Sequence, residues 1–208
     1  MIFDIDQLAE LKHLGCMFSD ISNDVFQNLK VETSSLENNQ KMISGLTSNG
    51  VATHYHFNQT DSFKQFQYFI ESKVQKYLRL FPKYINEFDI FSDDVPIMLD
   101  KPWFNIQKNH EFIPNHNHTG FLSYSGWIQV PFERSQIQGA SSCFEFIYPS
   151  VGRLKTLPLH VDRSFEGKIM FFPSALMHCV YPFYNSDIPR ISFSGNIMFD
   201  TSKTKKSV

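Results

Sequence analysis

Short apolar runs separated by glycine, proline and asparagine fill the chain from residue 97 onward. This pattern is typical of a β-sandwich or barrel, in which many short strands are joined by tight turns. We predict strands at 97–100, 103–110, 112–116, 121–131, 142–148, 153–162, 167–172, 177–183 and 190–199. Residues 97–200 are therefore predicted to form one β-rich core.

A different period marks one segment of the first half. After Thr60, apolar residues recur at spacings of three and four from Phe63 to Leu78, and Pro82 ends the run. This spacing predicts an amphipathic helix over about 60–81 whose aromatic stripe packs on the sheet.

The remainder of the first half gives weaker signals. A short helix is predicted over 20–29, capped near Ser22, and an edge strand over the alternating segment 51–57. We expect residues 1–96 to form an N-terminal helical extension of the same domain rather than a second domain.

Composition limits the possible partners. The 208-residue chain has a formal net charge of −2, and its basic residues cluster only in the tail 201–208, which we predict to be disordered. Duplex nucleic acid binding requires clustered Lys and Arg, so this charge disfavours it, although a single strand held by aromatic stacking stays open. No membrane span or signal peptide is expected.

The cysteines indicate the compartment. Cys16, Cys143 and Cys179 are odd in number, widely spaced and outside any metal-binding CxxC pattern. Reduced thiols in a cytoplasm, the host's if the protein is viral, fit best.

Histidines suggest the chemistry. His116 and His118 are two residues apart, a spacing that places both imidazoles on one face of an extended strand. His178 ends a later apolar run, and Arg190 follows it. Three imidazoles on one side of a metal would leave its other side open for ligands, and an arginine beside it could hold a carboxylate.

Five short motifs in order then carry a family resemblance. They are Trp103-Phe104-Asn105, His116-Asn117-His118, Ser125-Gly126, Phe172-Pro173-Ser174 with His178, and Arg190-Ile191-Ser192, closed by Asn196. The set resembles the iron(II)- and 2-oxoglutarate-dependent oxygenases, more narrowly a group of small members from bacteria and phages.

The resemblance implies a mainly β fold, the double-stranded β-helix or cupin-like jelly roll, with Fe(II), 2-oxoglutarate and O₂ at its site. It maps His116 and His178 onto the two histidine ligands of the family. Most members carry a carboxylate where this chain has His118. We interpret His118 as the third ligand, although a second-shell role, with water, Asp162 or Glu145 as ligand, stays open.

The cosubstrate contacts also follow from the resemblance. Arg190 should pair with the distal carboxylate of 2-oxoglutarate, with Ser192 donating a hydrogen bond beside it. The strand that carries Asn105 lines the cleft in the family, and Asn196 matches an asparagine that usually closes the pattern, so both are candidate cosubstrate contacts. Gln129 stands where the family usually has a tyrosine, and its amide replaces that contact or the contact is lost.

Two other histidine patterns compete with this site. His54 and His56 have the same spacing as His116 and His118, but no family motif follows them, so we interpret them as surface or packing residues. His160-Val161-Asp162 is chemically suited to iron, and we rank it lower because it lies too close to His178 in the sequence.

The predicted function is hydroxylation of an unidentified small molecule or protein side chain, with release of succinate and CO₂. Two alternatives remain: a jelly-roll binding or assembly protein with a structural metal or none, and a three-histidine iron dioxygenase that uses no 2-oxoglutarate. The sequence gives no indication of the oligomeric state.

Overall fold

The computed structural model describes residues 3–36, 41, 50–88, 96–200 and 202. Its helices are α1 (Ile5–His13), α2 (Asn23–Thr33) and α3 (Asp61–Leu80). Its strands are β1 (Met17–Asp20), β2 (Thr53–His56), β3 (Ile97–Leu99), β4 (Trp103–Gln107), β5 (Ile113–His116), β6 (Leu122–Gln129), β7 (Cys143–Ser150), β8 (Arg153–His160), β9 (Lys168–Pro173), β10 (Met177–Val180) and β11 (Arg190–Phe199). All nine strands predicted after residue 97 are present, most of them shorter than predicted.

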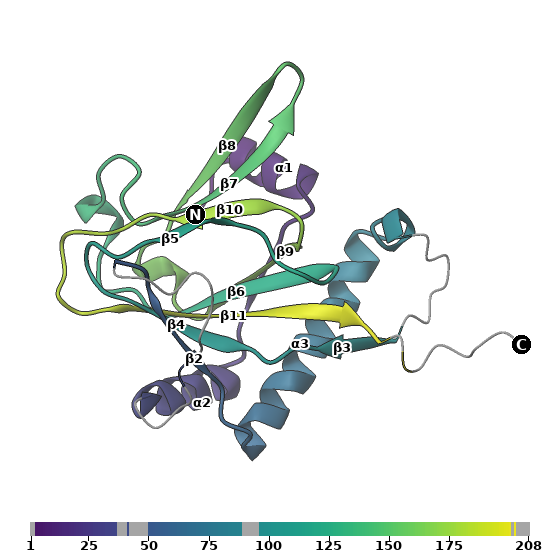
Figure 1. Ribbon diagram of the computed structural model, residues 1–208, viewed down its shortest axis with the longest axis horizontal. Helices are drawn as coiled ribbons and strands as arrows, with labels where there is room; N and C mark the ends of the chain where they lie inside the picture. The colour runs from purple at the N-terminus through teal and green to yellow at the C-terminus, as the bar shows by residue number, and fades with distance from the viewer. Residues whose placement is uncertain (1–2, 37–40, 42–49, 89–95, 201, 203–208) are drawn as a thin grey trace, which may run out of the picture.

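Two antiparallel sheets form the body of the protein. The larger has seven strands in the order β1-β9-β6-β11-β4-β2, with β3 paired to β11, and the smaller has the order β5-β10-β7-β8. Figure 1 shows the two sheets, with α2 and α3 on one side and the β7–β8 hairpin projecting beside α1. The arrangement is the jelly roll predicted from the sequence.

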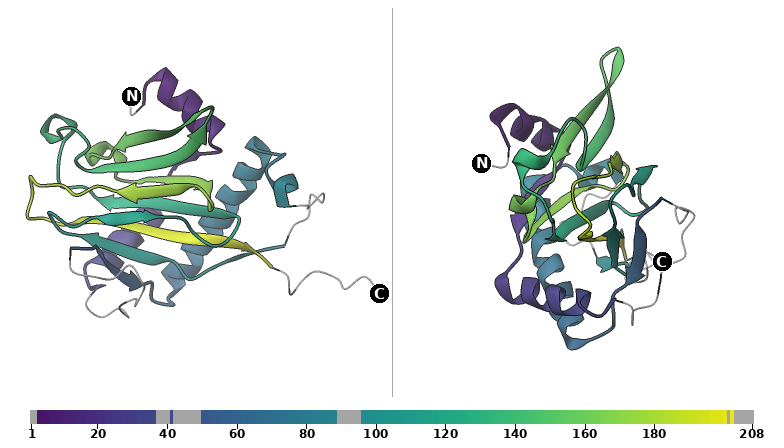
Figure 2. Two further views of the ribbon diagram at one scale, coloured as in Figure 1. Left: turned by 45° about the horizontal axis from the view of Figure 1, so that its top comes forward. Right: turned by 90° about the vertical axis from the view of Figure 1, so that its left-hand side faces the viewer.

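The aromatic residues fill two separate cores, one on each side of the larger sheet. Between that sheet and the helices, the stripe of α3, including Phe66 and Ile70, packs on Phe104 and Phe193. This confirms the predicted amphipathic helix, which begins where the Thr60 side chain accepts a hydrogen bond from the Phe63 backbone. Between the two sheets lies a second cluster, which includes Phe172 from the larger sheet. Figure 2 shows this layering from two further directions.

The N-terminal segment does more than pack on the sheet. It supplies β1 and β2, the strands at the two ends of the larger sheet, where they pair with β9 and β4. Neither α1 nor β1 was predicted, whereas the edge strand at 51–57 is confirmed as β2. The predicted disordered tail lies outside the described residues, except Ser202. Among the described residues, no helix has both the length and the hydropathy needed to cross a lipid bilayer.

Candidate metal centre

The three histidines singled out from the sequence meet between the sheets. One ring nitrogen from each of His116, His118 and His178 lies within 4.8 Å of the other two. No other such group of His, Cys, Asp and Glu occurs in the described part of the chain. His116 and His178 are direct partners across β5 and β10, and their ring centroids are 4.3 Å apart. Strand pairing therefore brings together two residues that are far apart in the sequence.

Backbone carbonyls fix the tautomers of two of these rings. The Nδ1 of His116 lies 2.8 Å from the Pro114 carbonyl oxygen, and the Nδ1 of His178 lies 2.9 Å from the Leu176 carbonyl oxygen. Because a carbonyl only accepts, Nδ1 must carry the proton and donate it. The Nε2 lone pair of each ring is therefore free to bind a metal, as ligand histidines require.

His118 is placed differently from the strand geometry that the spacing predicted. It follows the end of β5, and its backbone N–H donates to the carbonyl of Ser174, 2.9 Å away. Ser174 is fully buried, and its hydroxyl lies 2.8 Å from that of Ser123. The Phe-Pro-Ser segment before His178 thus holds the loop that carries the third imidazole.

Burial keeps all three imidazoles neutral. It is the largest cause lowering the pKa of His118 to about 4, and it lowers the pKa of His116 and, further still, that of His178. His178 is 2% exposed, and its ring stacks on Phe144 at 5.1 Å between centroids, with an interplanar angle of 9°. Neutral, buried, pre-oriented imidazoles suit a divalent transition metal.

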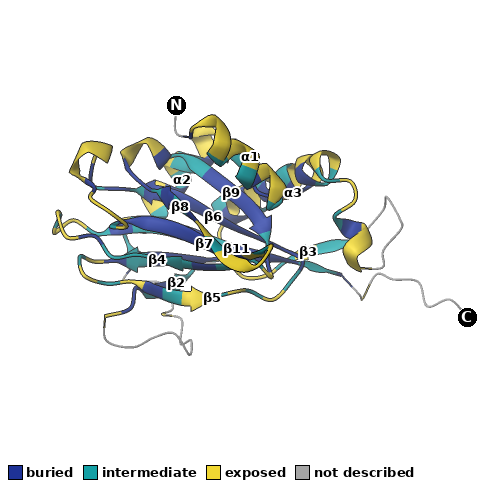
Figure 3. Cartoon of the chain, turned by 90° about the horizontal axis from the view of Figure 1, so that it is seen from above, coloured by how far each residue is buried: buried dark blue, intermediate teal, exposed yellow. Residues whose placement is uncertain are grey.

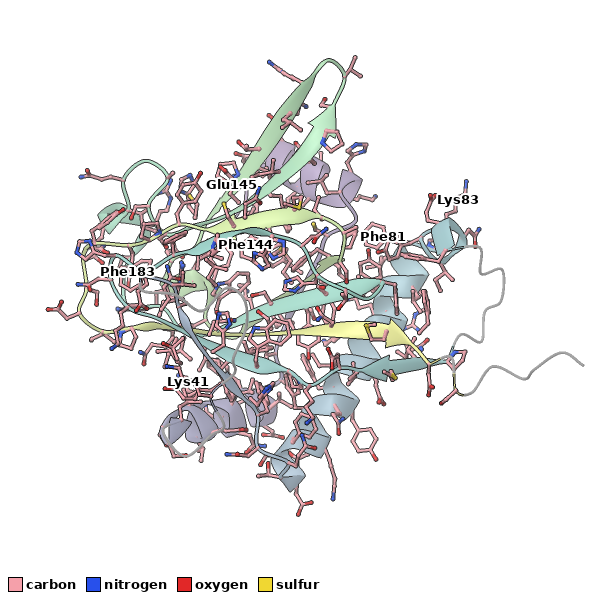
Figure 4. All side chains as sticks on the ribbon, viewed as in Figure 1. Lys41, Phe81, Lys83, Phe144, Glu145 and Phe183 are labelled. Atoms are coloured by element: carbon pink, nitrogen blue, oxygen red, sulfur yellow. The ribbon has the colours of Figure 1, made fainter. Side chains whose placement is uncertain are left out.

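A cavity of about 570 Å³ opens over this group, within the size range of ligand sites. The view coloured by burial (Figure 3) shows β6 and β7 mostly buried, whereas β2 and β5 include intermediate or exposed residues. Phe144, labelled in Figure 4, forms part of its apolar wall together with Trp127, Val161 and Phe172.

Arg190 lines the same cavity and is 2% exposed. Its Nε donates to Gln107 Oε1 at 3.1 Å, its Nη1 to the Ser142 carbonyl at 2.8 Å, and its Nη2 to Gln107 Oε1 and the Tyr181 carbonyl. All these acceptors are neutral, and no carboxylate of the described residues forms an ion pair with the guanidinium. Burial lowers the pKa of Arg190 to about 9. The buried charge thus lacks the protein counter-ion that buried charges usually have.

Three of the other predicted cosubstrate residues line the cavity. Asn105 and Ser192 are partners across β4 and β11, and the Asn105 amide donates to the Ser192 hydroxyl at 3.3 Å. Asn196 also faces the cavity and accepts a hydrogen bond from Ser123 through Oδ1. Gln129 does not line it, since its amide instead donates to the Pro189 carbonyl at 2.8 Å.

The competing ligands lie elsewhere. His160 is on β8, where its Nδ1 lies 3.1 Å from the sulfur of Cys143. Asp162 accepts hydrogen bonds from Ser164, and Glu145 accepts one from the Tyr181 hydroxyl. None of the three joins the histidine group.

His54 and His56, which the sequence interpretation treated as surface or packing residues, also line the cavity. They lie opposite Asn105 and Trp103 in the β2–β4 pairing. The only local signal for such a position was their spacing, which is the same as that of His116 and His118. Spacing alone does not show that β2 pairs with β4, and this pairing places both residues at the cavity. The structure therefore adds a second pair of imidazoles to the site.

The comparisons agree with this architecture. A family model described as "Putative 2OG-Fe(II) oxygenase" matches residues 101–196. No curated protein sequence matches the chain.

Similar folds occur in several solved structures. The epimerase SnoN from nogalamycin biosynthesis, in complex with Fe3+, alpha ketoglutarate and nogalamycin RO, has 14% identity and a TM-score of 0.61 over 93% of this chain and 82% of its own. A Pseudomonas putida prolyl-4-hydroxylase has 13% identity and a TM-score of 0.55 over 91% and 96%. HygX from Streptomyces hygroscopicus, with nickel and 2-oxoglutarate bound, has 9% identity and a TM-score of 0.55 over 97% and 89%.

Proposed function

This chain belongs to the 2OG-Fe(II) oxygenase superfamily, and on that premise we propose that His116, His118 and His178 bind its iron(II) while Arg190 anchors 2-oxoglutarate. The enzyme is a dioxygenase whose substrate is not established. The observation that carries the proposal is the convergence of three neutral imidazoles, two of which have their Nδ1 protons held by backbone carbonyls.

The buried arginine supports the choice of cosubstrate. Arg190 has only neutral acceptors among the described residues, so a dicarboxylate in the cavity would supply the missing negative charge. The guanidinium group of Arg190 already donates hydrogen bonds to the Gln107 side chain and to the Ser142 carbonyl. A carboxylate would therefore have to replace part of this contact, and Gln107 is the neutral group that it would displace.

When bound, iron(II) with 2-oxoglutarate and O₂ supplies the oxidising power, in which decarboxylation of the keto acid to succinate is coupled to oxygen insertion into a C–H bond. The residues of this chain position and shield that chemistry. Phe144, Trp127 and Phe172 form an apolar wall beside His178, which excludes water from the metal. Asn105 and Ser192 offer polar groups on the opposite strand pair.

An anaerobic titration tests this assignment. Fe(II) and 2-oxoglutarate added together should give the weak visible charge-transfer band of the chelate, and admission of O₂ should produce succinate. His178→Ala should lose the band, whereas His160→Ala, which removes the competing histidine on β8, should keep it. Absence of the band in the wild-type protein would contradict the proposal.

The imidazole of His118 also supports a second candidate function, a three-histidine iron dioxygenase that does not use 2-oxoglutarate. The third ligand is an imidazole rather than a carboxylate, and Arg190 is fully engaged with protein oxygens. Both features would suit this candidate. Such an enzyme would bind iron without the charge-transfer band and would consume O₂ without forming succinate. The same titration therefore separates the two candidates.

A small molecule or a protein side chain is the proposed substrate, since the cavity has a volume of about 570 Å³ and the chain carries a formal net charge of only −2. We place the protein in the cytoplasm because its three cysteines, all described, are free thiols.

A further inference from the structure

The cavity is larger than a keto acid and a metal require. Its volume is about 570 Å³, and its lining continues from the metal ligands to β2, the last strand of the larger sheet. That outer part includes His54, His56 and Trp103, which have no role in the site proposed above. It is therefore the part of the cavity in which a substrate must lie.

His54 occupies a central position in this outer wall. It is 4% exposed and lies opposite Asn105 in the β2–β4 register. Burial is the main cause that lowers the pKa of His54, with a smaller contribution from His116. The ring lines the same cavity as the metal group without belonging to it.

The Nε2 atom of His54 is buried and has no hydrogen-bond partner in the described part of the chain. Leaving such a group unpaired costs free energy in the ligand-free protein. Tyr124 also has an unpaired buried hydroxyl, but it lies in the helix-facing core and lines no part of this cavity. The His54 nitrogen is thus available to a molecule inside the cavity.

We propose that His54, supported by His56 and Trp103, is the substrate-binding wall of this oxygenase and that it takes an uncharged small molecule through a hydroxyl or amide group. This inference rests on the function proposed above, because it assumes that the reacting molecule enters this cavity. His54 binds and orients the substrate, with Nε2 donating to or accepting from its polar group.

The lining determines the charge of the substrate. The buried cation Arg190 is assigned to the cosubstrate, and the remaining charged groups, Asp100 and Lys101, are adjacent and exposed at the rim. The other polar groups of the outer lining are neutral hydrogen-bonding side chains: His54, His56, Asn117, Thr119 and Ser194. A buried ammonium or carboxylate would need a charged partner that this wall does not provide. The indole of Trp103 adds an apolar face.

Binding of defined probes tests the proposal without turnover. The protein is loaded with redox-inert Ni(II) and 2-oxoglutarate and titrated with myo-inositol and acetamide as neutral probes, and with L-glutamate and putrescine as charged ones. Saturation-transfer NMR reports binding, and the ¹⁵N shift of the His54 ring reports its contact. At least one neutral probe should bind and shift Nε2.

Two variants of His54 distinguish the contribution of its hydrogen bond to probe binding from the contribution of the volume that its ring occupies. His54→Phe keeps a planar ring without ring nitrogens and should weaken the neutral probe by about tenfold, the order of one lost hydrogen bond in a buried site. His54→Gln keeps a donor and an acceptor and should restore most of the affinity. His13→Phe, on the exposed end of α1, is the matched control and should change nothing.

Binding of the charged probes alone, failure of both neutral probes, or equal affinity in wild type and His54→Phe would each overturn the proposal. Affinity for 2-oxoglutarate, measured in the same samples, should be unchanged in every variant. The probe titrations are repeated on the metal-free protein. A protein that binds neither Ni(II) nor 2-oxoglutarate but still binds neutral probes through His54 would refute the proposed function and leave the recognition wall intact.

Discussion

Two segments of this chain have the same pattern, His-x-His, and the fold uses them differently. His116 and His118 lie beside the smaller sheet, where His178 is the cross-strand partner of His116. His54 and His56 lie on the larger sheet, where their partners are Asn105 and Trp103. Both pairs line one cavity. The two pairs differ in the residue across the strand: His116 faces a third imidazole, that of His178, whereas His54 and His56 face an amide and an indole.

Removal of a ligand should produce the largest difference between the two segments. His116→Ala or His178→Ala should weaken Fe(II) or Zn(II) binding by at least about 100-fold, because even outer-shell partners of metal ligands cost tenfold or more. His54→Ala should leave the affinity nearly unchanged. Anaerobic competition against a chelator measures both. Similar losses in the two segments would show that His54 is itself a ligand.

The cosubstrate provides a second test of the comparison, since Arg190 lies on the same sheet as His54 but is proposed to bind the cosubstrate at the site of His116. Arg190→Lys keeps the charge and loses the planar fork, so 2-oxoglutarate should bind roughly tenfold or more weakly, with the metal affinity retained. Titration of the metal-loaded protein with 2-oxoglutarate gives the affinity. Arg153→Lys, exposed on the β7–β8 hairpin, is the matched control. An unchanged affinity would favour the candidate that does not use 2-oxoglutarate.

Low pH should reduce the stability of the metal-free protein through both histidine segments, that of His54 and that of His118. Burial lowers the pKa of His54 and of His118 to about 4, below the ordinary value of 6.5. Between these values the unfolded chain binds protons that the folded metal-free protein does not, so stability rises with pH. Acidification from pH 7.5 to 4.5 should therefore lower the Tm of the metal-free protein by several degrees, and His54→Phe should reduce the slope. Thermal unfolding monitored by circular dichroism tests this, and a Tm that is flat below pH 6.5 would contradict it.

The smallest expected effect is a gain in stability. In the metal-free protein, His54→Phe removes a buried nitrogen without a partner in the described residues, and should stabilise the fold by about 1 kcal/mol. This corresponds to roughly 2–4 °C in Tm for a chain of this size. Urea denaturation at pH 7.5 measures the change. A loss of stability would indicate that the imidazole is held by the protein rather than kept for a ligand.

Local pattern was sufficient for much of the fold. The nine strands after residue 97 and the long helix, found at Asp61–Leu80, were predicted because side-chain period and turn residues are properties of neighbouring positions. The helix α1 and strand β1 were missed. Strand β1 has four residues and depends on pairing with β9, about 150 positions later. Pairing over such a separation leaves no local signal.

The site shows the same limit. His116, His118 and His178 were predicted together because ordered motifs surround them, and the structure brings them together. The spacing argument gave the wrong reason for His118, which leaves the strand and is positioned by Ser174. Gln129 was predicted to contact the cosubstrate only because of its position in a family motif. In the structure its side-chain amide donates a hydrogen bond to the Pro189 carbonyl, and the residue does not line the cavity. His54 was assigned to packing, since nothing in its own segment indicated that β2 would pair with β4.

The place of β2 at the end of the larger sheet has an evolutionary consequence. Among the described residues, β2 pairs with one strand, β4, and has a single further bridge, between Tyr55 and Lys41, whereas β10, which carries His178, is paired on both sides with β5 and β7. If β2 carries the substrate-binding wall proposed above, changes in its side chains would alter recognition without touching His116, His118 or His178, and related enzymes with new specificities should diverge first along this strand.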